Sequence, residues 1–381
     1  MKSKVGLKQV SLVFIVVFFL TTVMVPAASH AAASDALPHI VQVASPSLPL
    51  ALDDEGNVWC KAIHLISVKD GFHPKPMVKV KGLDKVKSLS VDGKFALKED
   101  GTVWKLEMYT NEQNNDINVL QTRFAGEQVS YLKDIVKVDS LNGLTSLAID
   151  KDGKAWVFEP GNEWQKKDPN LNVRDYASQV EGIADVQDYA LGHSGFLFLK
   201  KDGTVWVKEI MKFDGGLNYE NMRSVAPVQL KGLTDIVKLG PDMALKKDGT
   251  VWVWGTGSLA KNGERWATVA ANPHQVPGLS DIVDFSTDTA HALFVKKDGS
   301  VWKWGYMSEI SEKEGNYPDL VWKELFKVDR VDDAVLVSSE SWTNNMWSDA
   351  VIKKDGTMWL QDPKSHNEFY EKLLPVDFRK H

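Results

Sequence analysis

The chain has 381 residues, 43% of them hydrophobic and 25% charged, and this ordinary globular composition excludes wholesale disorder. Its formal net charge is −6, from 45 basic and 51 acidic residues, so the charge predicts no surface for nucleic acid. The single cysteine, Cys60, cannot form an internal disulfide. Stability must therefore come from the hydrophobic core.

The first 33 residues have the order of a secretory signal peptide. Three lysines, at positions 2, 4 and 8, precede an apolar run over residues 10–25 and a small-residue tail over residues 26–33. We therefore expect the segment 1–33 to be cleaved and the mature protein, with a net charge of −9, to be secreted without a membrane anchor. The alternative is a retained anchor, for which a run of sixteen residues is short.

A nine-residue phrase then recurs seven times. In each copy an apolar run leads into Asp-Gly or Glu-Gly and ends on a tryptophan three residues after the glycine. Glycine accepts a positive φ without steric cost, so this pattern predicts a tight turn between two strands. The turn glycines lie 45 to 57 residues apart, a spacing typical of propeller blades: Gly56, Gly101, Gly153, Gly203, Gly249, Gly299 and Gly356.

A second element also recurs: a short strand, a polar link and another short strand. It joins each hairpin to the next, so that each unit has four strands, called A to D in chain order. Both faces of the strands are apolar: in residues 251–255 (VWVWG) the valines point to one face and the tryptophans to the other, which indicates burial on both sides. We therefore predict an all-β, seven-bladed β-propeller of four-stranded antiparallel blades as the single domain of residues 34–381. The seven tryptophans are expected in its core, and the units at about 40–83, 84–133, 134–183, 184–233, 234–279, 280–331 and 332–378.

Ring closure is expected to involve both chain ends. The first unit begins with strand A near Ile40, and the last ends with strand D near Phe378. Closure protects the strand edges that an open ring exposes. Deletion of residues 373–381 is therefore expected to lower the thermal stability strongly.

Two of the seven units carry the motifs of a known family. Residues 227–255 and 274–305 resemble the regulator of chromosome condensation repeat, most clearly in the pairs Trp254-Gly255 and Trp304-Gly305 and in the Ala-His-Ala stretch around His291. The resemblance extends in degenerate form over the mature chain, and it implies a seven-bladed propeller. It therefore agrees with the repeat count.

The chain also departs from this family's pattern. The Gly-Gln-Leu-Gly stretch that usually follows Trp-Gly is missing, and histidine precedes strand B only at His291; comparable places hold Phe95, Thr145, Phe196 and Met243. The nucleotide-exchange role of the nuclear founding member does not carry over to a secreted chain. A relative that shares the expected extracellular location is the secreted bacterial propeller-type β-lactamase inhibitory protein, which binds an enzyme through one face.

Motifs for catalysis or cofactor binding are missing from the sequence. It has no HExxH or paired-His zinc motif and no Gly-rich phosphate loop. Residues 150–153 resemble the start of a calcium loop and residues 192–195 a nucleophile turn, but sister units predict a hairpin and a plain turn there. We therefore expect no catalytic residue, no metal and no cofactor.

Function is expected at one end of the ring. The A–B and C–D connections share that end and vary in length, with residues 306–325 among the long ones, whereas the B–C turns at the other end are uniform. We expect a secreted, monomeric, non-catalytic propeller that binds a protein partner, a secreted enzyme or a cell-envelope component. The candidate contact residues are Trp342, Met346, Trp347, Trp164, Trp266, Tyr306, Tyr317 and Trp322.

Two alternatives stay open. Trp342 and Trp347, flanked by Ser, Thr and Asn that make a continuous buried strand unfavourable, can instead plug the central channel or cap the last blade. The protein can instead bind or cleave carbohydrate, with a cell-wall glycan as partner and two carboxylates drawn from Glu309, Glu312, Glu314, Asp319, Glu163 and Asp168.

Overall fold

Short strands and tight turns make up the described part of the chain, in which no helix occurs. The structure, a computed structural model, describes residues 37–45, 49–61, 77–106, 126–140, 146–158, 177–192, 195–209, 225–254, 273–287, 291–309, 319–342, 346–361 and 373–378. All described strands lie within the unit Pro38–His381.

The strands form seven sheets, each of four antiparallel strands that follow one another in the chain. Blade 1 contains β1 (Ile40–Ala44), β2 (Leu50–Asp53), β3 (Val58–Lys61) and β4 (Met77–Lys79), and blade 2 contains β5 (Val86–Leu89), β6 (Phe95–Lys98), β7 (Val103–Lys105) and β8 (Glu127–Gln128). Blade 3 contains β9 (Ile135–Ser140), β10 (Ser146–Asp150), β11 (Ala155–Phe158) and β12 (Ala177–Gln179), and blade 4 contains β13 (Val186–Gly192), β14 (Gly195–Lys200), β15 (Val205–Glu209) and β16 (Val228–Gln229). Blade 5 contains β17 (Ile236–Gly240), β18 (Met243–Lys246), β19 (Val251–Val253) and β20 (His274–Gln275). Blade 6 contains β21 (Ile282–Thr287), β22 (His291–Lys296), β23 (Val301–Glu309) and β24 (Asp319–Lys327), and blade 7 contains β25 (Ala334–Trp342), β26 (Met346–Lys353), β27 (Met358–Gln361) and β28 (Leu373–Pro375). This arrangement confirms the predicted fold class.

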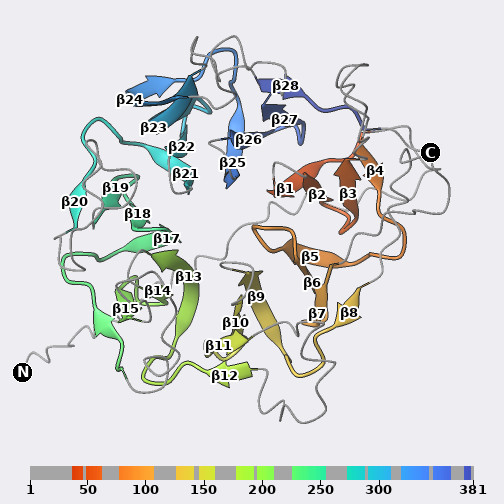
Figure 1. Cartoon of the computed structure of the whole chain (residues 1–381), viewed down its shortest axis with the longest axis vertical. Helices are drawn as coiled ribbons and strands as arrows, with labels where there is room; N and C mark the ends of the chain where they lie inside the picture. Colours follow the sequence, from red (N-terminus) through yellow and green to blue (C-terminus); the bar gives the residue numbers. More distant parts are fainter. Residues whose placement is uncertain are drawn as a thin grey trace, which may run out of the picture. The chain divides into compact units, whose positions relative to one another are not determined.

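The first strand of each blade is the innermost. Figure 1 shows β1, β5, β9, β13, β17, β21 and β25 around the centre of the ring, with the fourth strand of each blade on the outside. We name the strands A to D from the inside outward. Because they alternate in direction, the A–B and C–D connections share one end of the ring, the loop end, and the B–C turns and D–A links share the other, the turn end.

Hydrophobic side chains fill the seams between neighbouring blades. Met243 and Leu245 of blade 5, for example, pack with Phe285 and Phe294 of blade 6. The described chain has seven such clusters, each drawn from two adjacent blades, so that every seam has its own core. Each blade thus buries both faces, which is why its strands lack the polar alternation of a half-exposed sheet.

The recurring phrase builds the same turn in successive blades. In blade 5, Asp248 accepts hydrogen bonds from the Thr250 amide (2.9 Å) and hydroxyl (2.6 Å), and the Trp252 Nε1 donates to Thr250 Oγ1 at 3.1 Å. Lys246 Nζ lies 4.6 Å from the centroid of the Trp252 ring, a cation–π contact. Blades 2, 4 and 6 repeat these contacts with Thr102, Thr204 and Ser300 in the place of Thr250.

These contacts correct the expectation that all seven strand-C tryptophans are core residues. Trp59 is buried, but Trp104, Trp156, Trp206, Trp252, Trp302 and Trp359 are half-buried. The reason is that each indole lies beside the turn, at the edge of the core, where a hydroxyl, a carboxylate or a lysine side chain covers part of it. Five of the six half-buried rings also pack against a seam cluster.

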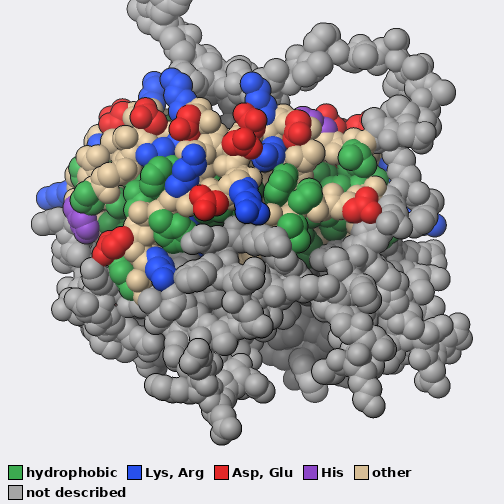
Figure 2. Space-filling view, turned by 90° about the horizontal axis from the view of Figure 1, so that it is seen from above, with side chains coloured by type: hydrophobic (Ala, Val, Ile, Leu, Met, Phe, Trp, Pro, Cys, Tyr) green, Lys and Arg blue, Asp and Glu red, His purple; other side chains and the backbone are tan. Residues whose placement is uncertain are grey.

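The turn end carries charges of both signs. Lys201 with Asp202, and Lys247 with Asp248, are exposed neighbours on two of the turns. Figure 2 shows Lys, Asp and Glu side chains intermixed along the upper edge of the described surface. Opposite charges this close cancel most of each other's field, so these turns do not create a surface of one sign.

A backbone hydrogen bond at the turn end joins each blade to the next. The first strand-A amide donates to the carbonyl of the preceding blade's turn glycine, as Ala334 does to Gly299 at 3.0 Å. The glycine is needed for two reasons: its φ is +79°, and a Cβ there would lie 2.8 Å from the Asp333 Cα. Asp333 itself has a φ of 53°, a left-handed conformation that aspartate tolerates better than most residues.

The ring closes without strand exchange between the first and last blades. After β28 the chain runs on to Phe378, which forms a parallel bridge with Met77, and the Met77 amide donates to the Asp377 carbonyl at 2.9 Å. Phe378 is buried and packs edge-on against Trp59, with ring centroids 5.6 Å apart. Both ends of the propeller therefore meet at the closing seam.

Candidate functional site

Two neighbouring blades carry hairpins that extend further than those of the other blades. In blade 6, β23 and β24 have nine residues each, whereas strands C and D of the other blades have two to five. In blade 7, β25 has nine residues and β26 has eight. One hairpin is a C–D and the other an A–B connection, so both reach toward the loop end. They are called the paired hairpins below.

The paired hairpins replace predicted loops with strands. The expected connection over residues 306–325 continues as a ladder to Glu309 opposite Asp319. Ser341 and Ser348, beside the two tryptophans, did not prevent pairing, which extends to Trp342 opposite Met346. Backbone pairing with a long partner strand outweighs the local preference of polar residues, because strand propensity depends mainly on context.

The paired hairpins contain five of the eight predicted contact residues. Tyr306 pairs with Trp322, Trp342 with Met346, and Trp347 with Ser341 across the two ladders. The half-buried Trp322 packs edge-on against Trp304, with ring centroids 5.7 Å apart and planes at 81°. The other three predicted residues, Trp164, Trp266 and Tyr317, lie outside the described residues.

A buried charged network joins the bases of the paired hairpins. Asp349 of β26 accepts a 2.5 Å hydrogen bond from Lys303 Nζ of β23, and its other oxygen lies 2.8 Å from His291 Nε2 of β22. None of the three side chains is more than 4% exposed. One carboxylate of blade 7 thus contacts two strands of blade 6, and it fixes β26 against β23.

The charge state of Asp349 suits this role. Burial by itself would raise the pKa of the carboxyl, but the Lys303 ammonium and the His291 ring hold the pKa well below its ordinary value. The carboxylate is therefore ionised throughout the neutral range. A carboxyl with a depressed folded-state pKa stabilises the fold above its unfolded pKa and loses that contribution only as the pH falls toward the folded value.

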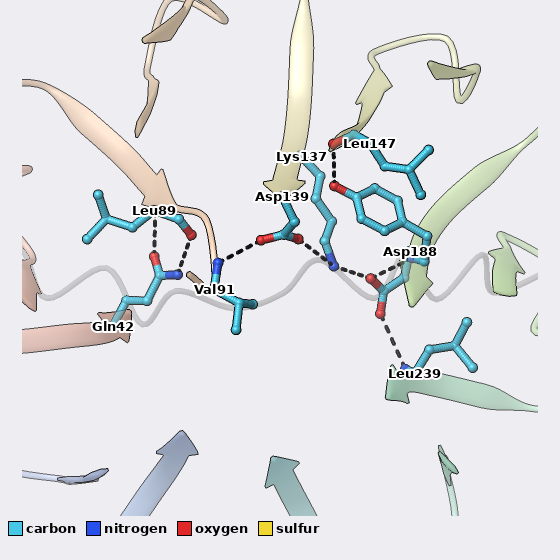
Figure 3. Close-up of polar contacts among 9 residues, drawn as sticks. Gln42, Leu89, Val91, Lys137, Asp139, Leu147, Asp188 and Leu239 are labelled. Carbon is cyan, nitrogen blue, oxygen red and sulfur yellow. Dashed lines mark hydrogen bonds and ion pairs between the residues drawn. The ribbon is translucent and has the colours of Figure 1, made fainter. Parts of the chain in front are cut away.

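A belt of polar contacts also joins the inner strands (Figure 3). The Gln42 side chain bonds both the amide and the carbonyl of Leu89 in the next blade, at 2.9 and 2.7 Å. The Asp188 carboxylate pairs with the Lys137 ammonium on one side and accepts from the Leu239 amide at 3.3 Å on the other. Side chains on strand A therefore link each of these blades to its neighbour.

The same belt continues through blades 5 to 7. Lys238 Nζ lies 2.5 Å from the Asp284 carboxylate, whose second oxygen accepts from the Val337 amide at 3.0 Å. The Ser339 amide donates to Ser286 Oγ at 3.0 Å. The seam between blades 6 and 7 thus holds both the belt and the buried network.

Asp139 is the member of the belt that titrates near neutral pH. Its carboxylate accepts from the Val91 amide at 2.8 Å and lies 3.9 Å from Lys137 Nζ. Burial raises the pKa of Asp139 to about 6, although Lys137 and the Val91 amide act to lower it. Burial, with the charges of Asp139 and Asp188, raises the pKa of the neighbouring Tyr189 well above its ordinary value.

Sequence reasoning missed Lys303 and Asp349, although each left a signal. Lys303 lies between Trp302 and Trp304 in VWKWG, at the place that Val253 occupies in VWVWG of blade 5. Asp349 begins the run DAVI of a strand that is buried on both faces. A charge within such a strand predicts a buried partner of opposite sign, because charged residues are almost never fully buried unless they are paired.

No three or more His, Cys, Asp or Glu residues among those described are placed to hold a metal ion. The described residues also include no helix that is long and apolar enough to span a membrane.

The sheets, the seams and the turn glycines define the class of protein, a seven-bladed β-propeller. No protein-family model matches the chain, and no curated protein matches it. Solved structures do. Prp20p of Saccharomyces cerevisiae is 16% identical, with 91% of each chain covered and a TM-score of 0.54.

Two further structures are similar. Yeast RCC1 (Prp20) with Kap60 bound to it is 16% identical, with a TM-score of 0.54 over 93% of this chain and 91% of that one. Human WBSCR16 is 14% identical, with a TM-score of 0.47 over 85% of this chain and 94% of that one. The likeness to yeast RCC1 confirms the propeller architecture that the Trp-Gly motifs predicted.

Proposed function

We propose that this protein is a secreted, non-catalytic propeller that binds a protein partner through its loop end, with the paired hairpins at the centre of the contact. The observation that carries the proposal is the pair itself: extended ladders on adjacent blades, seated on the buried Asp349, Lys303 and His291. Preorganised residues lose little conformational freedom on binding, so a rigid platform favours affinity.

The composition of the paired hairpins supports a protein partner. They carry Tyr306, Trp322, Trp342, Met346 and Trp347, and aromatic residues and methionine are enriched in protein interfaces. Prp20p is described with its binding to Gsp1p and histones, and yeast RCC1 with Kap60. Those partners belong to those proteins; what they support is protein binding as a use of this fold.

The partner is expected outside the cell, because the first 33 residues have the pattern of a signal peptide. Sequencing the N-terminus of the exported protein tests this part of the proposal. The expected sequence begins close to residue 34, and an exported chain that begins at Met1 would contradict it.

The binding surface is tested by a paired substitution. The mature chain is used to isolate a partner from secreted proteins and cell-wall fractions, and the affinity is measured for wild type, for Trp342→Ala with Trp347→Ala, and for Lys201→Ala with Lys247→Ala. We expect the tryptophan pair to weaken binding about 100-fold or more without a change in melting temperature. The lysine pair, at the turn end, should bind like wild type.

Two results would overturn this assignment. A lower melting temperature with unchanged affinity in the folded fraction would show that both tryptophans stabilise the core or plug the channel and do not bind the partner. Enrichment of a glycan in place of a protein would favour the carbohydrate alternative, for which Glu309 and Asp319 lie opposite each other at the end of the β23–β24 ladder.

A further inference from the structure

The seven seams of the ring are held unequally. At six of them a strand-A side chain bonds the neighbouring blade, through Gln42, Asp139, Lys137, Asp188, Lys238 and Asp284. In blade 7 the third residue of strand A is Leu336, where blades 1, 4 and 6 have Gln42, Asp188 and Asp284. Leucine can neither donate nor accept a hydrogen bond, so this position adds no polar link from blade 7 to blade 1.

The closing seam also lacks a covalent link. At each other seam the D–A link contributes a buried apolar residue to the core, as Leu83 does between blades 1 and 2 and Leu233 between blades 4 and 5. At the closing seam β28 and β1 are not consecutive in the chain, and Phe378 joins the cluster that contains Trp59 and Met77. Phe378 thus fills the place in the core that a residue of the D–A link fills at the other seams, although no D–A link joins blade 7 to blade 1.

The segment that carries Phe378 is a short strap. Residues 373–375 pair with β27 at the outer edge of blade 7, and the Val376 amide donates to the Met358 carbonyl at 2.9 Å. Figure 1 shows the chain continuing from β28 toward β4. The strap thus meets blade 1 only over its last residues, through the Met77 bridge and the packing of Phe378.

We propose that the ring opens reversibly at this seam, that residues 373–378 act as a detachable strap, and that the slot vacated by Phe378 takes the same strand from a second copy of the chain. The slot recognises an extended segment by two features. It offers backbone pairing along β27 and at Met77, and apolar surroundings for one aromatic ring in the cluster that includes Trp59 and Met358. Strand addition of this kind needs no new fold in either copy.

Hydrogen exchange on the full-length protein tests the opening. The amides of Ile40, Val86, Ile135, Val186, Ile236, Ile282 and Ala334 each donate to a turn-glycine carbonyl, at 2.9 to 3.2 Å. Since these bonds are equivalent, a difference in protection reports opening of the seam and not a weaker bond. We expect Ile40 to be protected about tenfold less than the other six, together with Met77. Equal protection of all seven would overturn the proposal.

A substitution separates local opening from general destabilisation. Phe378→Ala is expected to lower the protection of Ile40 and Met77 about tenfold further while Ile236, between blades 4 and 5, keeps its value. A purely structural role would lower all seven amides by a similar factor, and that result would contradict a local strap.

The slot is tested by adding the strand back. A synthetic peptide of residues 373–381 is titrated into the full-length Phe378→Ala protein, beside a control peptide with the same Phe378→Ala change. The wild-type peptide should restore the protection of Ile40 in a saturable manner, and the control peptide should not. Failure of the wild-type peptide, or equal rescue by both, would overturn the slot.

Discussion

The seam between blades 6 and 7 and the closing seam between blades 7 and 1 share one design and differ in the contacts that are added to it. Both use the same backbone bond, from Ala334 to Gly299 and from Ile40 to Gly356, at 3.0 Å in each case. The first seam adds the buried Asp349 network, the belt and a covalent link, whereas the second adds the strap and its aromatic contact. The backbone thus sets the geometry of the ring, and side chains decide how firmly each joint holds.

The difference matters for the proposed function because the two seams flank the same blade. Blade 7 is tied to blade 6 through Asp349, at the base of the paired hairpins. Its other side faces the closing seam. Opening of that seam would therefore leave the paired hairpins in place, since the contacts that position them lie on the opposite side of the blade.

The largest expected effect comes from breaking the stronger seam. Asp349→Ala leaves Lys303 buried without its carboxylate, and removing one partner of a buried ion pair costs about 3–5 kcal/mol. Urea denaturation measures the loss. The control is Asp332→Ala, which removes a pair with Lys353 in which Asp332 is 82% exposed, and which should leave the urea midpoint close to that of wild type. Similar losses in both variants would contradict the buried network.

The turn glycines allow a direct comparison of the two seams. Gly299→Ala puts a Cβ 2.8 Å from the backbone of Asp333 at a φ of +79°, and we expect a loss of about 3 kcal/mol. Gly356→Ala has the same φ, and its Cβ would lie 2.8 Å from the His39 Cα and would also meet the His39 ring. Because no D–A link joins blade 7 to blade 1, the backbone at His39 can shift away, and a smaller loss, of about 2 kcal/mol, is expected.

A third glycine isolates the conformational part of these losses. Gly232 has a φ of +87° and nothing within 4 Å of an added Cβ. Gly232→Ala should therefore cost about 1–2 kcal/mol from the left-handed conformation alone. If all three variants lose the same amount, the close approach of the next blade is not what requires glycine at the turns.

The pH dependence of the belt gives a third measurement. The folded-state pKa of Asp139 is raised to about 6, so the folded protein binds a proton more tightly than the unfolded chain does. The contribution of Asp139 to stability therefore weakens as the pH rises from about 4 to about 6 and is constant above that, a loss of about 3 kcal/mol. Asp139→Asn should remove this slope in denaturation curves taken between pH 4 and 8. A slope that persists in the variant would assign it to another group.

The smallest expected effect is a gain at the closing seam. Leu336→Gln puts in blade 7 the residue type that Gln42 uses in blade 1 to bond Leu89 of the next blade. By the same geometry the new amide should bond Val43, stabilise the protein by about 1 kcal/mol and raise the protection of the Ile40 amide. The control is Leu336→Met, which adds no such donor or acceptor. A gain in the control equal to that in the Gln variant would count against a polar belt.

The fold could be predicted from the sequence because the same local pattern repeats. The Asp-Gly turn, the tryptophan three residues later and the apolar faces recur seven times, so chance variation in one copy does not hide the pattern. The strand-C tryptophans were expected inside the core, but most of them lie at its edge, because side chains of the turn such as lysine and threonine cover part of the ring, and a one-dimensional pattern does not show that cover.

The candidate site was less accessible to sequence reasoning. Trp342 and Trp347 were noticed as residues, but their place in an extended ladder depends on pairing with a strand of unusual length. The partnership of Lys303 with Asp349 joins residues 46 positions apart on two blades, and only the three-dimensional register brings them together.

Closure by a strap has a consequence for how the chain can be ordered. Because every blade is one contiguous segment, no blade needs residues from both termini to complete its sheet. Joining residue 378 to residue 38 and cutting a D–A link elsewhere would keep all seven sheets intact and move the weak joint to the new cut. The order of the blades along the chain can therefore be permuted in this architecture, and the seam that lacks a D–A link moves with the cut.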